Sequence, residues 1–201
     1  MNFGKDITGK WRPIVKQERG YSCGPACVKM ISYLVNNIEL GEDFTRASII
    51  KAEGNLDTSL GLGGVVVEGA RDFNRMGTWN ICEGIDALRP LIRYEIYTNG
   101  GLMGLGGIGK IKSSARDINV LSRTTIKKPA IINVNWRDGG AHWIVIAGRL
   151  NDTNFLVLDP WYGVQYVRVN PIGGFFNYTP RDNAGIVLAY SVWGDSIALV
   201  I

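Results

Sequence analysis

Apolar side chains recur at helical spacing directly after Cys23 and predict a helix with a buried face. They lie three or four residues apart and are Ala26, Cys27, Met30, Ile31, Leu34 and Val35. Gly24 and Pro25 stand at the expected start, where the missing N–H of proline costs no hydrogen bond. The pair Asn36-Asn37 is typical of a helix end. A short strand is predicted before the helix, over residues 11–15.

The middle of the chain carries weaker helical patterns and one segment of biased composition. Helices are predicted over residues 43–52, where Asp43 is a suitable N-terminal cap, and over roughly 63–76. A further short helix is predicted around 114–121. Residues 99–109 are rich in glycine, which predicts a mobile loop.

The pattern changes after Pro129 to short runs of β-branched and aromatic residues. These runs predict strands over residues 130–136, 142–150, 155–158, 164–169 and 185–190. Turn-forming residues separate them, and Asp138-Gly139-Gly140 between two apolar runs is a good hairpin signal. Helices first and antiparallel strands afterwards indicate the α+β class rather than alternating α/β.

Length and composition fit one globular domain. The chain has 201 residues, of which 46% are hydrophobic and 20% charged, close to the average for a folded soluble domain. We therefore expect a single domain over residues 1–201. Its helical half spans about 1–125 and its β half about 126–201.

The charge and the cysteine content limit which partners and which cellular compartment are expected. The net charge of +4 is not concentrated in any basic block, so no nucleic-acid partner is expected. No apolar run is long enough to span a bilayer, and the first residues lack the apolar segment of a secretory signal. Three cysteines are too few for a disulfide framework and suggest reducing surroundings. We expect a cytoplasmic protein, or one secreted without a cleavable signal into a target cell.

The glycine-rich segment imitates a phosphate-binding loop. Gly104 to Gly109 fits the pattern G-x-G-x-x-G, and Lys110 follows it. A P-loop needs Ser or Thr after the lysine, where this chain has Ile111, and no βαβ unit surrounds the segment. We therefore interpret it as a flexible flap and expect no cofactor.

Cys23 lies at the N-terminus of the predicted helix, where the helix dipole and free N–H groups stabilise a thiolate. Cys27, one turn further on, lies on the apolar face. Gln17 precedes Cys23 by six residues, so its side-chain N–H₂ could lie where an oxyanion forms during acyl transfer. Taken alone, the segment is explained as well by a capped helix with two buried, inert cysteines.

His142 is the one histidine of the chain, so no mechanism that needs two histidines applies. It opens a predicted strand, and Asp159 follows a hairpin, seventeen residues later. Adjacent strands could bring this carboxylate against the imidazole, fix its tautomer and stabilise an imidazolium beside a thiolate. One histidine and three cysteines make a poor zinc site, and no metal is expected.

Three segments together resemble papain-like cysteine peptidases. They are Gln17-x5-Cys23-Gly24-Pro25-Ala26-Cys27, the strand from Gly140 to Gly148 with its Ala-His-Trp, and Leu158-Asp159-Pro160-Trp161. The chain is most similar to the bacteriocin-processing, double-glycine-type peptidase domains of bacterial ABC exporters and to related papain-like bacterial effector proteases. The resemblance implies a papain-like fold, in which the helix that carries the nucleophile packs on a C-terminal antiparallel sheet that carries His and Asp.

The same resemblance implies a thiol protease that cleaves a peptide or protein substrate. Carried over by position, Cys23 is the nucleophile, His142 the general base and acid, Asp159 the residue that orients it, and Gln17 the oxyanion donor. The exporter-linked domains continue into a membrane region and an ATPase, which this chain does not show. A free-standing bacterial enzyme is therefore expected, for example an effector or toxin with a cognate inhibitor or immunity protein.

Two other functions stay open at this stage. The same thioester chemistry on a glutamine side chain would make a deamidase or transglutaminase-type effector. A papain-like fold with an inert cysteine would only bind peptides. Trp143, Trp161 and Tyr162 flank the expected triad and are candidate substrate-binding residues, although core packing explains Trp143 equally well.

Overall fold

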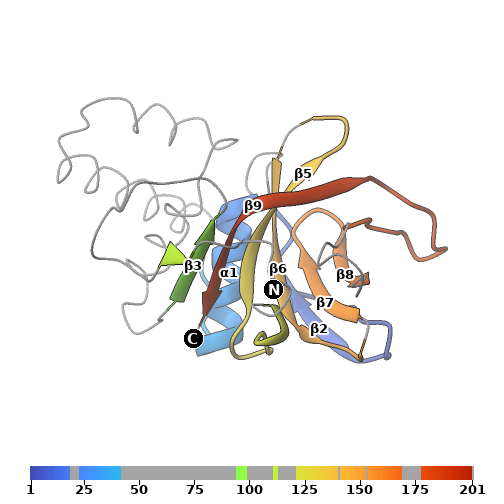
Figure 1. Cartoon of the computed structure of the whole chain (residues 1–201). Coiled ribbons are helices and arrows are strands. Elements are labelled where there is room, and N and C mark those ends of the chain that lie inside the picture. Colours follow the sequence, from blue (N-terminus) through green and yellow to red (C-terminus); the bar gives the residue numbers. More distant parts are fainter. Residues whose placement is uncertain are drawn as a thin grey trace.

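One helix and two sheets make up the described part of the molecule (Figure 1). The computed structural model describes residues 1–18, 23–41, 94–98, 111–112, 121–139, 141–152, 154–168 and 178–200. The helices expected over 43–52 and 63–76, the glycine-rich segment 99–109 and Cys82 lie outside the described residues. So does almost all of the helix expected around 114–121.

The helix α1 spans Cys23–Asn36, as its apolar spacing predicts. It is buried on nearly every side, which is typical of a helix enclosed by its own domain. Asn37 takes a left-handed conformation (φ 57°) directly after the last turn, a common helix ending. The ammonium group of Lys127 donates a hydrogen bond to the carbonyl of Leu34 (2.7 Å), where the helix dipole favours a positive charge. No helix within the described ranges is long and apolar enough to cross a bilayer.

The larger sheet has seven strands in the order β4-β3-β9-β5-β6-β7-β8. Its strands are β3 (Tyr94–Thr98), β4 (Ile111–Lys112), β5 (Ala130–Trp136), β6 (Ala141–Arg149), β7 (Asn154–Asp159), β8 (Gly163–Arg168) and β9 (Ser191–Val200). All neighbours are antiparallel except β3 and β4. Strands β5 to β8 follow one another through short turns, so four of the expected strands are confirmed to within two residues.

The fifth expected strand is wrong. Residues 185–190 form no strand, and the side chains of Ile186, Leu188 and Tyr190 are exposed. The amide of Leu188 donates to the carbonyl of Pro180 (2.9 Å), so this segment folds back on its own neighbourhood instead of joining the sheet. The strand lies just beyond it, as β9, and pairs with both β3 and β5. The expected α+β class agrees with the mixed structure, although strands also occur within residues 1–125.

The side chains of the sheet alternate between two hydrophobic clusters. One cluster lies between the sheet and α1 and includes Trp143, Val145 and Leu158. The other lies on the opposite face and includes Ile144 and Val157. By the same alternation, His142 lies on the same face of the sheet as Ile144, and Asp159 lies on the same face as Val157.

The smaller sheet is the hairpin of β1 (Asn2–Lys5) and β2 (Trp11–Ile14). Its turn is organised by the buried side chain of Asp6, which accepts hydrogen bonds from Thr8, Lys10 and Arg12. The hairpin lies against the start of β8. A Cβ atom at Gly4 would lie 2.7 Å from the Cγ2 of Val164, so only glycine permits this close approach.

Candidate functional site

The buried carboxylate of Asp159 organises the site from the end of β7. One oxygen, Oδ1, accepts hydrogen bonds from the backbone amides of Trp161 (2.6 Å) and Tyr162 (3.0 Å), an Asx-type turn that Pro160 favours. The other oxygen, Oδ2, accepts a hydrogen bond from the hydroxyl of Tyr178 (2.6 Å). These donors supply hydrogen bonds to a carboxylate that is completely buried.

His142 donates to this carboxylate from the neighbouring strand. Its Nε2 lies 2.9 Å from Oδ1 of Asp159, and only 2% of the histidine is exposed. The contact expected between the two strands is therefore confirmed. Burial alone lowers the pKa of His142, but the charge and hydrogen bond of Asp159, with smaller contributions from Cys23, raise it to about 10. The imidazole is thus held in its charged form over the physiological pH range.

Cys23 is the first residue of α1, 8% exposed, and lies within the interaction range of His142. A hydrogen bond and the charge of Cys23 both favour the imidazolium form of this histidine. Because Asp159 occupies Nε2, Nδ1 is the ring nitrogen left for the thiol. The positive end of the helix dipole acts on the same sulfur. The structure thus brings together a thiol, an imidazole and a carboxylate from three elements.

Cys27 differs sharply from Cys23. It is completely buried in the cluster between the sheet and α1. Burial, followed by the charges of Cys23 and Asp159, raises the pKa of the Cys27 thiol well above its usual value. Cys27 therefore stays protonated and serves packing.

Gln17 lies beside the turn that carries Asp159. Its backbone amide donates to the carbonyl of Pro160 (3.0 Å), which ties the segment before α1 to this turn. The residue is half-buried. The structure therefore places Gln17 in the neighbourhood of the site, and its role as oxyanion donor stays a prediction.

The three expected substrate-binding aromatics separate into two groups. Trp143 is 5% exposed and packs in the cluster facing α1, which favours core packing over a role in binding. Trp161 is 55% exposed, and its ring meets that of His142 edge-on at 6.5 Å. Tyr162 lies next to Trp161, with ring centroids 6.3 Å apart. Trp161 thus borders the imidazole and Tyr162 borders Trp161, and their role in substrate binding stays a prediction.

Two residues of the site were not predicted from the sequence. Trp136, at the end of β5, stacks on His142 with ring centroids 5.3 Å apart and planes inclined by 26°. The hairpin signal at 138–140 could have indicated it, because Val134 and His142 pair across the turn and Trp136 follows on the same face. Tyr178 reaches Asp159 from a segment without a regular element, and no pattern in the sequence marks it.

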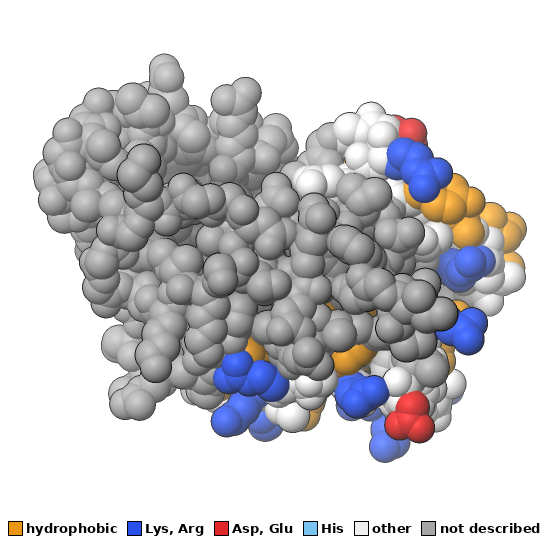
Figure 2. Space-filling model, viewed as in Figure 1, with side chains coloured by type: hydrophobic (Ala, Val, Ile, Leu, Met, Phe, Trp, Pro, Cys, Tyr) orange, Lys and Arg blue, Asp and Glu red, His pale blue; other side chains and the backbone are white. Residues whose placement is uncertain are grey.

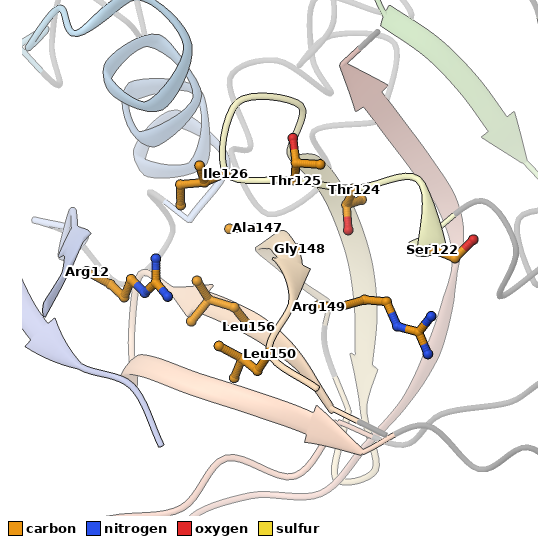
Figure 3. Close-up of a pocket in the computed structure, with 10 residues that line it drawn as sticks. All are labelled: Arg12, Ser122, Thr124, Thr125, Ile126, Ala147, Gly148, Arg149, Leu150 and Leu156. Carbon is orange, nitrogen blue, oxygen red and sulfur yellow. The ribbon is translucent and has the colours of Figure 1, made fainter. Parts of the chain in front are cut away.

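Two cavities lie apart from these residues. One, of about 330 Å³, lies at the far end of β6 and is lined by Ala147, Gly148 and Arg149 among others (Figure 3). Another, of about 430 Å³, runs along β8 and includes Arg168 and Arg181. At the right-hand edge of the face in Figure 2, exposed hydrophobic side chains lie beside basic ones. Neither cavity is lined by Cys23, His142 or Asp159.

Within the described ranges, no group of three or more His, Cys, Asp or Glu side chains is arranged to hold a metal ion. Comparison with protein-family models and with curated proteins finds no match to this chain.

Proposed function

We propose that the protein is a cysteine peptidase of papain-like architecture, with Cys23 as nucleophile and His142 and Asp159 as its partners. The observation that carries the proposal is the buried hydrogen bond of 2.9 Å between His142 and Asp159, with Cys23 acting on the same imidazole from a helix N-terminus. A nucleophile, a base and a residue that orients the base form the arrangement required for acyl transfer.

In the proposed reaction, the thiolate of Cys23 attacks the carbonyl carbon of a peptide bond. The negative oxygen that forms is stabilised by the side-chain N–H₂ of Gln17 and the backbone N–H of Cys23. His142 donates its proton to the leaving amine as the C–N bond breaks, which leaves a thioester. Water then attacks the thioester, His142 accepts its proton, and the carboxylate product departs from the regenerated thiolate.

Asp159 holds the imidazole throughout this cycle without taking up a proton. Its four hydrogen bonds hold the carboxylate in place. Both described cysteines are free thiols, in keeping with a protein that acts in a reducing cytosol, its own or that of a target cell. We further propose that the enzyme acts on a peptide or protein as a free-standing bacterial enzyme or toxin, with an immunity protein as its natural inhibitor.

The decisive experiment incubates the protein with a proteome-derived peptide library and identifies new amino termini by mass spectrometry. The wild type is expected to create them, and Cys23→Ala and His142→Ala to create none. Cys27→Ala is the matched control, because it removes a thiol from the same helix outside the proposed site; it is expected to retain cleavage. Cleavage by Cys23→Ala at the wild-type rate would overturn the proposal.

The same samples separate the two competing functions. A deamidase leaves the peptide chain intact and converts glutamine to glutamate, which shifts the mass without new termini. An inert binding module does neither. In that case iodoacetamide would label Cys23 at a rate that does not depend on His142, whereas a thiolate–imidazolium pair makes labelling slower in His142→Ala.

A further inference from the structure

The ring of Trp136 is the centre of an aromatic cluster around the imidazole. Besides its stacking on His142, it meets Tyr162 edge-on at 5.9 Å and lies 6.2 Å from Tyr178, with planes inclined by 38°. These partners come from β6, from the turn after Asp159 and from the segment that follows β8. Trp136 is therefore fixed in place by the same surroundings that fix the His142–Asp159 pair.

The stacked geometry favours one protonation state of His142. The face of an indole ring carries negative potential, and it attracts a cation whose centre lies within about 6 Å. The centroid distance of 5.3 Å is inside this range, and the small interplanar angle presents the face of the indole to the imidazole. A neutral imidazole gains much less from such a contact.

The other groups that act on His142 leave a distinct role for Trp136. Asp159 supplies a negative charge and a hydrogen bond at one ring nitrogen, and Cys23 acts on the ring from α1. Among the described residues, Tyr162 and Tyr178 contact Trp136, and their phenol pKa values are raised by burial and then by the charge of Asp159, so they stay neutral. Trp161 meets the imidazole edge-on, whereas Trp136 packs its face against the plane of the ring.

We propose that Trp136 is a positioning residue that stabilises the imidazolium form of His142 and holds its ring plane between Asp159 and Cys23. Trp136 touches no reacting atom in this proposal and acts through His142. The link to catalysis rests on the proposed peptidase function, whereas the effect on the charge of His142 does not.

The test is an NMR titration of His142, whose ring signals are unambiguous because the chain contains one histidine. In Trp136→Leu the titration midpoint is expected to fall by about one pH unit relative to the wild type. Trp136→Phe keeps an aromatic face and is expected to recover most of the shift. The matched control is Trp11→Leu, which removes an exposed indole on the β1–β2 hairpin and is expected to leave the midpoint unchanged.

A second measurement covers the case in which Trp136→Leu fails to fold. Tryptophans carrying one to four ring fluorines keep nearly the same shape but weaken the negative face of the ring step by step. These fluorinated tryptophans are incorporated into the variant Trp161→Phe, which removes the indole that meets His142 edge-on. Among the described ring contacts, Trp136 is then the one tryptophan against His142. The midpoint is expected to fall progressively with fluorination. A midpoint that stays constant across the series, or in a folded Trp136→Leu, would overturn the proposal.

The outcome separates this proposal from the peptidase function. A falling midpoint in a protein that cleaves no peptide supports the role of Trp136 and contradicts the peptidase. Peptide cleavage by a protein whose midpoint stays constant supports the peptidase function and contradicts the role of Trp136. If both hold, Trp136→Leu is expected to shift the alkaline limb of the pH–rate profile downward by the amount measured by NMR.

Discussion

The imidazole of His142 and the carboxylate of Asp159 lie 2.9 Å apart, joined at the adjoining ends of two antiparallel strands. The residues are 2% and 0% exposed, so water screens the pair little. Removing one member of a buried ion pair costs about 3–5 kcal/mol, because the remaining charge has no compensation. The pair is therefore coupled to the stability of the whole sheet as well as to its proposed chemistry.

This coupling predicts a loss of stability at alkaline pH. The pKa of His142 is raised from 6.5 to about 10 in the folded state. Its contribution to the free energy of unfolding is fully present below the ordinary value and is lost as the pH rises through about 10. Urea unfolding measures this contribution as the difference in the free energy of unfolding between the wild type and Asp159→Asn. We expect the variant to be less stable at pH 6 and the two proteins to converge above pH 10, whereas a difference independent of pH would contradict the assignment.

Tyr178 is expected to contribute to stability through its hydroxyl. Tyr178→Phe leaves Oδ2 of a buried carboxylate without the hydrogen bond of 2.6 Å, which should lower the free energy of unfolding by about 1–3 kcal/mol. Tyr166→Phe removes a hydroxyl from a partly exposed tyrosine of β8 and serves as the control. Chemical denaturation of both variants checks the prediction, and equal, small losses would show that the hydroxyl of Tyr178 is not needed.

The stabilisation that Asp6 gives to the β1–β2 turn should depend on pH in the opposite direction and be lost in acid. Burial opposes ionisation of Asp6, but hydrogen bonds from Thr8, Arg12 and Lys10 outweigh it and lower the pKa of Asp6 to about 2. The stabilisation, about 2 kcal/mol, is present above the ordinary value of 3.8 and is lost as the pH falls through about 2.

Thermal unfolding between pH 7 and pH 2 tests this expectation. Asp6→Asn should be less stable than the wild type at pH 7, and the difference should shrink toward pH 2. Asp138→Asn replaces an exposed aspartate of the β5–β6 turn and should leave the unfolding temperature nearly unchanged. A loss in Asp6→Asn that is the same at every pH would show that the charge of Asp6 does not carry the effect.

A side chain at Gly148 is expected to destabilise the fold. It has a φ of 110° at the irregularity of the β6–β7 pairing, and a Cβ atom there would lie 3.1 Å from the Cα of Thr125. Gly139 has a similar φ of 102° but open space around it. Urea unfolding should therefore show that Gly148→Ala loses about 1–3 kcal/mol more than Gly139→Ala. Equal losses would mean that the backbone conformation alone sets the cost.

The elements that sequence reasoning predicted well are those whose partners are close in the chain. Short turns separate β5, β6, β7 and β8, so alternation and turn residues determine their pairing locally. The same reasoning brought His142 to Asp159. The start of α1 at Cys23 followed from apolar spacing and from Gly24-Pro25.

The elements that sequence reasoning missed depend on distant partners. Residues 185–190 and 191–200 both contain apolar runs, and only the free edges of β3 and β5 decide which one becomes a strand. The contact of Tyr178 with Asp159 depends on packing between segments, which spacing along the chain does not encode.

The central position of β9 has a consequence for synthesis. This strand comes last among the described strands, yet it lies between β3 and β5 in the sheet. Because β9 joins them, the β3–β4 and β5–β8 parts of the sheet cannot be connected before residues 191–200 have left the ribosome. Such late, non-local pairing slows folding. Any reactivity of the Cys23 thiol that requires the completed sheet is therefore absent from the nascent chain until β9 is in place.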